Sequence, residues 1–185
     1  MDPCGLTKSF YDEARESWLC AGCGNPREER AIDVQVEAEP PVNIPLNFAQ
    51  GSTVGIANKD FLFSLGKEHV IGHLHLGGVL GPNGDLLEDW FSFVGRHRLI
   101  VRGSEHAQAR VCTVCGKNVY FAVGQRYLYP HPPLGVRIFD AGTGSLVITK
   151  ELMDCVDLQK WKHLKCIGLE VLESPRDGYL DLRGI

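Results

Sequence analysis

The chain has 185 residues and a formal net charge of −4, with 44% hydrophobic and 23% charged residues. These fractions are ordinary for a globular protein, so we treat residues 1–185 as a single domain and exclude disorder, collagen and coiled coil as its main state. The net negative charge disfavours direct binding to nucleic acid, whose phosphates attract basic proteins, and favours a basic protein as partner.

The chain shows no signal for a membrane or for export. Its longest apolar runs are a few residues, against the ~20 that a membrane helix needs. The first residues lack the basic start and apolar core of a secretory signal. We therefore expect a cytoplasmic protein whose seven cysteines are reduced thiols.

The first half of the chain is predicted to contain two short helices and several strands. Asn58 is a good helix cap, and the Asn-Gly turn at 81–84 is typical of a hairpin. In order, we expect a helix at 10–18, a strand at 31–38, a proline-rich connector at 39–45, a helix at 59–67, a strand at 70–80 and its return strand at 86–94.

The second half is predicted to contain mostly strands. We expect a strand at 98–101, a hairpin of 118–123 with 126–129 around Gly124-Gln125, strands at 136–139 and 146–148, a helix from Thr149 to about residue 164, and a last strand at 167–172. The fold class is therefore α+β, with mostly antiparallel strands and a few short helices.

Two segments resemble each other and suggest half-repeats at 17–103 and 109–185. Residues 56–62 and 147–153 share the order apolar, apolar, cap, Lys, acid, apolar, apolar. A strand is expected to begin soon after each helix, at Ile71 and at Ile167. The alternative is that any two strand–cap–helix units look alike without being a repeat.

Four of the cysteines form a repeated motif, Cys20-Ala-Gly-Cys23-Gly24 and Cys112-Thr-Val-Cys115-Gly116. Two residues between the thiols allow both sulfur atoms to point at one ion, and the following glycine permits the positive φ of a tight turn. Two such turns supply the four ligands of a structural Zn²⁺. The spacing thus predicts a zinc-ribbon-like site of Cys20, Cys23, Cys112 and Cys115 that joins the two halves.

Two alternatives for these cysteines stay open. Each pair could be a separate redox dithiol, although such a motif belongs at a helix start after a strand. The four thiols could also carry no metal. Of the remaining cysteines, Cys155 and Cys166 are expected in the core, and Cys4 is too near the terminus to interpret.

Histidine and arginine provide weaker candidates. If 70–80 is a strand, His73 and His75 share one of its faces and could bind a catalytic metal, but a third ligand and a general base would be needed. We therefore predict that neither is catalytic. Arg96, Arg98 and Arg102 form a basic cluster that is typical of a solvated strand. Recognisable catalytic motifs are absent, so we do not expect an enzyme.

The strongest candidate for partner binding is the hairpin after residue 84. Asp85, Glu88 and Asp89 stand beside Trp90, and aromatic side chains ringed by charge are typical of binding hot spots. These four residues are our candidates for contact with a basic partner. The alternative is that Trp90 faces inward.

The two Cys-x-x-Cys-Gly motifs, Cys20–Gly24 and Cys112–Gly116, resemble the double-CXXCG family of small bacterial proteins, which is abundant in myxobacteria. The ending also resembles that family, from Val136-Arg-Ile-Phe-Asp to Ile167-Gly-Leu-Glu-Val-Leu. The resemblance implies that the four cysteines are metal ligands. It also implies an immunity protein that silences a cognate toxin used in kin discrimination. In some cases that toxin is a nuclease. The surface that meets the toxin varies within the family, so no toxin-binding residue is implied.

Other functional classes remain open. The chain could be a zinc-ribbon adaptor or regulator that binds nucleic acid or protein. If it bound nucleic acid, it would need a basic stripe on its surface. A metalloenzyme would need an open metal position near His73 and His75. The immunity protein agrees best with the acidic charge and with the lack of catalytic motifs.

Overall fold

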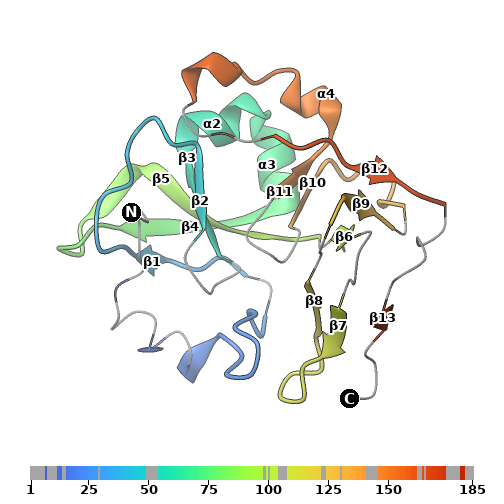
Figure 1. Cartoon of the computed structure of the whole chain (residues 1–185). Coiled ribbons are helices and arrows are strands. Elements are labelled where there is room, and N and C mark those ends of the chain that lie inside the picture. Colours follow the sequence, from blue (N-terminus) through green and yellow to red (C-terminus); the bar gives the residue numbers. More distant parts are fainter. Residues whose placement is uncertain are drawn as a thin grey trace.

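The computed structural model describes residues 7, 12–13, 16–28, 30–48, 54–97, 99, 101–103, 108–121, 124–129, 131–140, 146–161, 164, 166–173 and 180–181. The described part is α+β, and strands dominate it (Figure 1). Its helices are α2 (Lys59–Ser64), α3 (Lys67–His73), α4 (Lys150–Met153) and the 3-10 helix η1 (Leu158–Lys160). Its strands are β1 (Val34–Gln35), β2 (Leu46–Phe48), β3 (Gly55–Asn58), β4 (Leu74–Leu80), β5 (Leu86–Gly95), β6 (Val101–Gly103), β7 (Gln108–Val111), β8 (Asn118–Phe121), β9 (Arg126–Leu128), β10 (Ile138–Asp140), β11 (Leu146–Ile148), β12 (Glu170–Val171) and β13 (Leu180–Asp181).

The largest sheet has five strands in the order β1-β4-β5-β3-β2. The hairpin of β4 and β5 lies at its centre and turns at the predicted Asn-Gly site. β5, β3 and β2 are antiparallel neighbours, whereas β1 is parallel to β4. Three smaller sheets have the orders β10-β11, β12-β9-β6 and β13-β7-β8. The expectation of mostly antiparallel pairing is confirmed.

Both faces of the five-stranded sheet are covered, because alternate side chains of β3 and β5 enter different core clusters. Ile56, Trp90 and Val94 pack with the N-terminal segment of Trp18 and Leu19. The opposite face packs against α2, α3, α4 and the residues on either side of η1, with the buried side chains Ala57, Phe61, Leu62, Leu65, Val70, Leu74, Phe93, Ile138, Leu152, Val156 and Trp161. Figure 1 shows these helices on one side of the sheet and the N-terminal segment on the other. A smaller cluster contains Leu99, Val101, Leu128 and Phe139.

Several local predictions are confirmed. The Asn58 side chain accepts a hydrogen bond of 2.9 Å from the backbone N–H of Asp60 and so caps α2. The strand predicted at 31–38 is shorter, yet Val34 and Val36 are buried and the residues beside them are not. β10 and β11 pair as expected. Within the helix predicted at 10–18, residues 12–13 and 16–17 are helical and residue 18 is in a turn, while the others lie outside the described residues.

The strand predicted at 70–80 is wrong in its first part, because residues 67–73 form helix α3. Val70 is buried within the helix, and Leu74, the first residue of β4, is buried as well. Ile71 is exposed on the other side of the helix. The strand therefore begins at Leu74.

The hairpin predicted for 118–123 with 126–129 is also wrong. β8 pairs with β7, and β9 pairs with β6 in a different sheet. The tight turn that contains Cys112–Gly116 lies between β7 and β8 and brings these two strands side by side. The strand predicted at 98–101 is β6, which runs from Val101 to Gly103; residues 98 and 100 lie outside the described residues.

The C-terminal helix is shorter than predicted. It ends at Met153, and Asp157 then accepts a hydrogen bond of 3.0 Å from the backbone N–H of Gln159 to begin η1. Such local side-chain bonds compete with a continuous helix. The last strand is also short, because only Glu170 and Val171 pair with β9.

The half-repeat remains a prediction. Both 56–62 and 147–153 are a strand followed by a short helix, as β3–α2 and β11–α4. The third correspondence differs, since Ile71 lies within α3 and Ile167 lies outside any helix or strand.

Candidate metal centre

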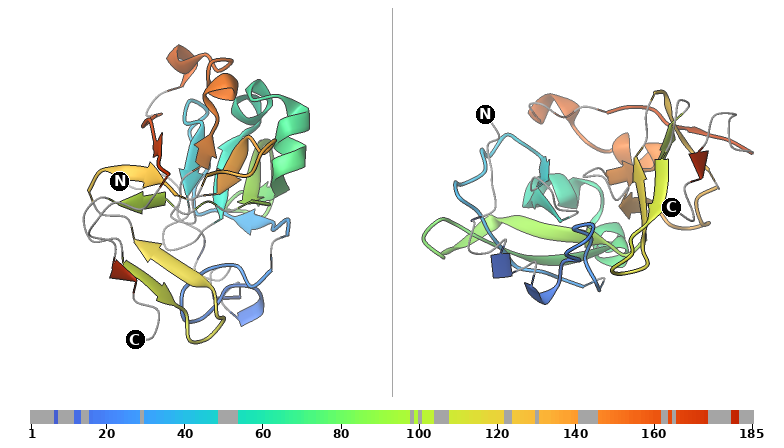
Figure 2. Two further views of the ribbon diagram at one scale, coloured as in Figure 1. Left: turned by 90° about the vertical axis from the view of Figure 1, so that its right-hand side faces the viewer. Right: turned by 60° about the horizontal axis from the view of Figure 1, so that its bottom comes forward.

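Two turns from distant parts of the chain bring four cysteine thiols together. The first knuckle, residues 19–26, is closed by a bridge between Leu19 and Pro26. The second knuckle, residues 112–117, is the turn between β7 and β8. In both views of Figure 2 the yellow turn after β7 lies beside the blue turn of the first knuckle. The four Sγ atoms of Cys20, Cys23, Cys112 and Cys115 all lie within 4.8 Å of one another.

The repeated sequence gives the same backbone geometry twice. In the first knuckle, Cys20 N–H donates to Asn25 O and Gly24 N–H donates to Cys20 O, both at 2.8 Å. In the second, Cys112 N–H donates to Lys117 O at 2.9 Å and Gly116 N–H to Cys112 O at 2.8 Å. Gly24 and Gly116 have φ values of 69° and 68°. The glycine after each cysteine pair thus has the positive φ that the sequence predicts.

The spacing of the sulfur atoms fits a tetrahedral metal. With metal–sulfur bonds of about 2.3 Å, the sulfur atoms of a tetrahedral zinc site are about 3.8 Å apart. Cys20 Sγ lies 3.6 Å from Cys112 Sγ, and Cys23 Sγ lies 3.6 Å from Cys115 Sγ. All four are free thiols. The cluster could therefore hold a metal ion between the two knuckles.

The backbone and burial divide the four thiols into two kinds. The backbone N–H groups of Cys115 and Val114 lower the pKa of Cys112 to about 6. Burial raises the pKa of Cys20, but the Gly22 N–H, which lies 3.4 Å from its Sγ, and neighbouring groups outweigh it, so the net shift is downward. Burial raises the pKa of Cys23 to about 12 and also raises that of Cys115. In each knuckle the pKa of the first cysteine is thus lowered and that of the second is raised.

Contacts around the cluster hold the two knuckles against each other. The Lys117 ammonium donates a hydrogen bond of 2.7 Å to Pro26 O. Gly22 lies against the second knuckle, since a Cβ at this position would be 2.8 Å from Val114 Cγ2 and 3.0 Å from Cys112 Sγ. The close approach of the two turns therefore depends on the absence of a side chain at position 22.

The cysteines outside the motif do not join the cluster. Cys155 and Cys166 are exposed, so the prediction that they lie in the core is wrong. Cys155 follows the end of α4, and its thiol donates to Glu151 O at 3.5 Å. The nearby Leu152 and Val156 are buried, whereas Cys155 faces solvent. Cys4 lies outside the described residues.

The expected His73–His75 pair is replaced by a different histidine cluster. His73 ends α3 while His75 is in β4, so the two do not share a strand face. The His73 ring instead stacks on His69, with centroids 6.3 Å apart, and meets His97 edge-on at 5.8 Å. Burial, followed by the charges of His97, His69 and Arg137, lowers the pKa of His73. His69 and His73 are four residues apart, which places them on one face of a helix. This spacing indicates their contact only if the segment is interpreted as a helix and not as a strand.

The predicted partner-binding residues separate into two groups. Asp85, Glu88 and Asp89 are exposed on the hairpin of β4 and β5. Trp90 is only 5% exposed and belongs to the core, so it is not available as an anchor for a partner. The sequence interpretation missed Leu86, which is 60% exposed between the acidic residues.

Arg96, from the predicted basic cluster, is exposed, and its Nε donates to Leu74 O at 3.2 Å. Arg98 and the side chain of Arg102 lie outside what the structure describes. Among the described residues, no helix is both long and apolar enough to cross a membrane.

Comparisons of the chain with protein-family models, with curated proteins and with solved structures found no match. The function must therefore be argued from the cysteine cluster, the charged surface and the cavities of this chain itself.

Proposed function

We propose that this chain is a cytoplasmic immunity protein that binds a cognate toxin and neutralises it by stoichiometric binding. The observation that carries the proposal is the convergence of the two Cys-x-x-Cys-Gly turns, because these are the residues that resemble the double-CXXCG family. In this role the protein needs a rigid scaffold and a recognition surface, and it needs no catalytic residues. The toxin is a basic protein, for example a nuclease whose phosphate-binding face carries positive charge.

The cysteine cluster holds one structural Zn²⁺ in this proposal. Four thiolates are a common ligand set for structural zinc, and they leave no open position for a water or a substrate. The two knuckles are 92 positions apart at Cys20 and Cys112, so the ion connects distant parts of the chain. Its contribution is to hold the surface that meets the toxin.

The first candidate for that surface is the acidic hairpin, which we define as Asp85, Leu86, Glu88 and Asp89. The three carboxylates are exposed and would attract a basic toxin over a distance. Leu86 takes the role that was expected for Trp90, because it is the exposed apolar side chain of the hairpin. An apolar contact surrounded by charge is a common arrangement at binding hot spots.

Co-expression with the product of the neighbouring gene, followed by pull-down and a growth assay, tests the function. We expect a complex of defined stoichiometry and rescue of growth. Absence of both the complex and the rescue would contradict the immunity function. Elemental analysis of the purified protein should find about one zinc per chain.

A charge-reversed hairpin tests the surface separately. Asp85, Glu88 and Asp89 are changed together to Lys, and the control changes three exposed acids elsewhere, Glu68, Glu151 and Asp154, to Lys. We expect the hairpin variant to associate with the toxin about tenfold more slowly or worse, with the difference shrinking in high salt. Equal association rates for the two variants would reject the acidic hairpin and leave the immunity function standing.

A further inference from the structure

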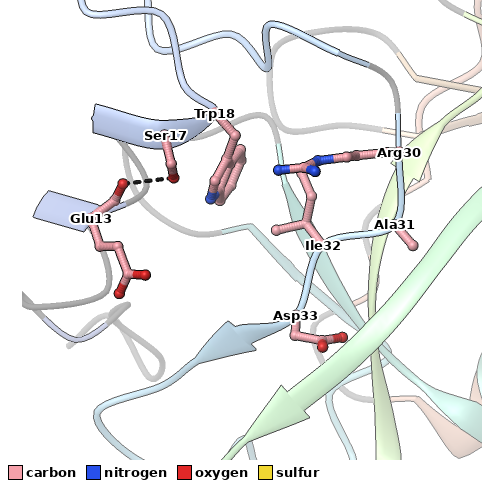
Figure 3. Close-up of a pocket in the computed structure, with 7 residues that line it drawn as sticks. All are labelled: Glu13, Ser17, Trp18, Arg30, Ala31, Ile32 and Asp33. Carbon is pink, nitrogen blue, oxygen red and sulfur yellow. Dashed lines mark hydrogen bonds between the residues drawn. The ribbon is translucent and has the colours of Figure 1, made fainter.

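A cavity of about 300 Å³ opens between the N-terminal segment and the segment that leads into β1. It is lined by Glu13, Ser17, Trp18, Arg30, Ala31, Ile32 and Asp33 (Figure 3). None of these residues belongs to the cysteine cluster or to the acidic hairpin. Trp18 and Ile32 are buried members of the core, so one wall of the cavity is fixed by packing.

Hydrogen bonds hold the other walls in place. Asp33 Oδ1 accepts a bond of 2.6 Å from the backbone N–H of Gly78 in β4. The Ser92 hydroxyl donates to Ile32 O, which anchors the same segment to β5. On the opposite wall, Ser17 Oγ donates to Glu13 O at 2.8 Å. The cavity is therefore a feature of the folded sheet and its N-terminal cover.

The charge around the cavity favours a cationic occupant. Residues 12–39 of the sequence include three bases, Arg15, Arg27 and Arg30. They include eight acids, Asp12, Glu13, Glu16, Glu28, Glu29, Asp33, Glu37 and Glu39. Two of these acids, Glu13 and Asp33, are among the residues that line the cavity, as is Trp18. A carboxylate pair next to an indole suits a cation that is both charged and flat.

Arg30 shows that a guanidinium fits this space. Its side chain extends across the cavity toward the Trp18 indole (Figure 3). Arg30 is exposed, so it can turn out to solvent without breaking core packing. The cavity thus has room for a guanidinium that could come either from this chain or from another molecule.

We propose that this cavity takes an arginine side chain from the basic face of a partner protein, with Arg30 moving out as it enters. The incoming guanidinium lies between the Glu13 and Asp33 carboxylates and against the Trp18 indole. Arginine suits this site better than lysine, because its planar group stacks on an aromatic ring and binds carboxylates in pairs. This inference rests on the proposed function for the identity of the partner, the toxin.

Asp33 brings the cavity close to the acidic hairpin. A Cβ at Gly78 would lie 3.2 Å from Leu86 Cδ1 and 3.3 Å from Asp33 Oδ1. Asp33 therefore lies beside the hairpin as well as in the cavity. A basic partner that meets the hairpin would bring its side chains within reach of the cavity.

The test uses N-acetyl-L-arginine amide as the probe and the metal-loaded, ¹⁵N-labelled full chain. The indole N–H signal of Trp18, assigned with a Trp18→Phe variant, reports occupancy of the cavity. We expect saturable shifts with the arginine probe, weaker shifts with N-acetyl-L-lysine amide and none with N-acetyl-L-glutamate amide. Shifts of equal size with all three probes would overturn the site.

Variants of opposite sign sharpen the test. Glu13→Gln with Asp33→Asn should weaken the arginine probe at least about tenfold, while the new amide in Asp33→Asn keeps an oxygen that accepts from Gly78. Arg30→Ala should strengthen binding, because it removes the competing guanidinium. The control, Glu68→Gln with Asp154→Asn, removes two exposed acids outside the cavity and should change nothing. Binding that is unchanged in both cavity variants would overturn the inference.

The probe needs no toxin, so the two proposals can fail independently. If the arginine probe fails while the toxin complex forms and protects, the cavity is not an arginine site and the immunity function stands. If the probe binds as expected and no toxin complex forms, the arginine site stands and its partner is a different basic protein.

Discussion

The two cysteine knuckles have the same turn but very different support. Leu19 of the first knuckle is fully buried and packs with Trp18 against the five-stranded sheet. The second knuckle lies at the turn of the β7–β8 hairpin, where Val111 is exposed and Val114 is 61% exposed. No described side chain of β7, β8 or the turn between them belongs to a core cluster.

This difference indicates what a metal ion bound by the four cysteines would do for the fold. A Cys-x-x-Cys-Gly sequence is sufficient for the turn itself, since the backbone bonds are the same in both knuckles. It is not sufficient to place the turn. The first knuckle is placed by apolar burial, whereas the second depends on the thiol cluster, the Lys117–Pro26 bond and the Gly22–Val114 contact.

Removing the metal should have the largest effect and should act mainly on the second knuckle. In zinc-finger peptides, zinc binding contributes roughly 10–16 kcal/mol of apparent free energy. We expect chelation, or Cys112→Ser, to release the β7–β8 hairpin while β3 and β5 stay folded. Hydrogen exchange followed by mass spectrometry should show faster exchange in residues 108–121 and little change in 55–58 and 86–95.

The control for this experiment is Cys155→Ser, which removes an exposed thiol outside the cluster. It should leave the zinc content, the melting temperature and the exchange pattern unchanged. Uniform loss of protection across both regions on chelation would show that the two knuckles are equally dependent on the metal. An unchanged melting temperature in Cys112→Ser would contradict a structural metal.

The next effect in size concerns the contact between the knuckles. Gly22→Ala places a methyl group 2.8 Å from Val114 Cγ2, so one turn must move. Mutation of groups that hydrogen-bond to metal ligands typically costs 10–100-fold in metal affinity. The Gly22 N–H makes such a bond to Cys20 Sγ, and we expect a loss of about tenfold in a competition titration with a chromogenic chelator. Gly72→Ala is the matched control, because a Cβ there meets no atom within 4 Å. Adding Val114→Ala removes the atom that the new methyl group meets and should restore part of the affinity. Equal metal affinities for Gly22→Ala and Gly72→Ala would exclude a role for the Gly22–Val114 contact.

The sequence could predict the knuckles because their chemistry is local. The ligand spacing, the positive φ of Gly24 and Gly116 and the Asn58 cap each depend on a few neighbouring residues. The sequence predicts that the two turns meet only because a structural metal needs four ligands and each turn supplies two. The cysteine spacing therefore predicts the cluster, whereas strand patterns do not predict that β7 and β8 pair to carry it.

The errors concern interactions that no short window contains. Gly124-Gln125 resembles a hairpin turn, but β8 takes β7 as its partner across the second knuckle. Alternation places Trp90 and Phe91 on opposite faces of β5, but it cannot say that both faces are covered. The sequence therefore predicts Trp90 in a partner-binding surface, whereas it packs under the N-terminal segment.

Lys117 provides a smaller test of the same comparison. Its ammonium donates to Pro26 O at 2.7 Å and so links the second knuckle to the first. Lys117→Met keeps most of the side-chain length and removes the donor. We expect the free energy of unfolding to fall by about 1.5 kcal/mol, the lower end of the usual contribution of a hydrogen bond that involves a charged group. The loss should disappear in the chelated protein, where the knuckles are already apart; a loss that persists after chelation would place the effect elsewhere.

The smallest effect belongs to α3, on the side of the sheet that has no knuckle. Burial and the charges of His97, His69 and Arg137 lower the pKa of His73 below 6.5, so the folded state favours the neutral ring. Above pH 6.5 the ring is neutral in both states and its contribution to stability is complete. As the pH falls below 6.5, the unfolded chain binds the proton more readily than the folded chain. The contribution of His73 to stability is therefore lost as the pH falls to the folded-state pKa.

His73→Gln should therefore flatten the decrease in melting temperature between about pH 7 and pH 5. The control His131→Gln, which changes an exposed histidine next to Glu173, should not. Because α3 packs on the face of the sheet opposite to the first knuckle, the same flattening should be measured after chelation. If chelation abolishes it, the two regions are coupled and the independence of the sheet from the metal is wrong.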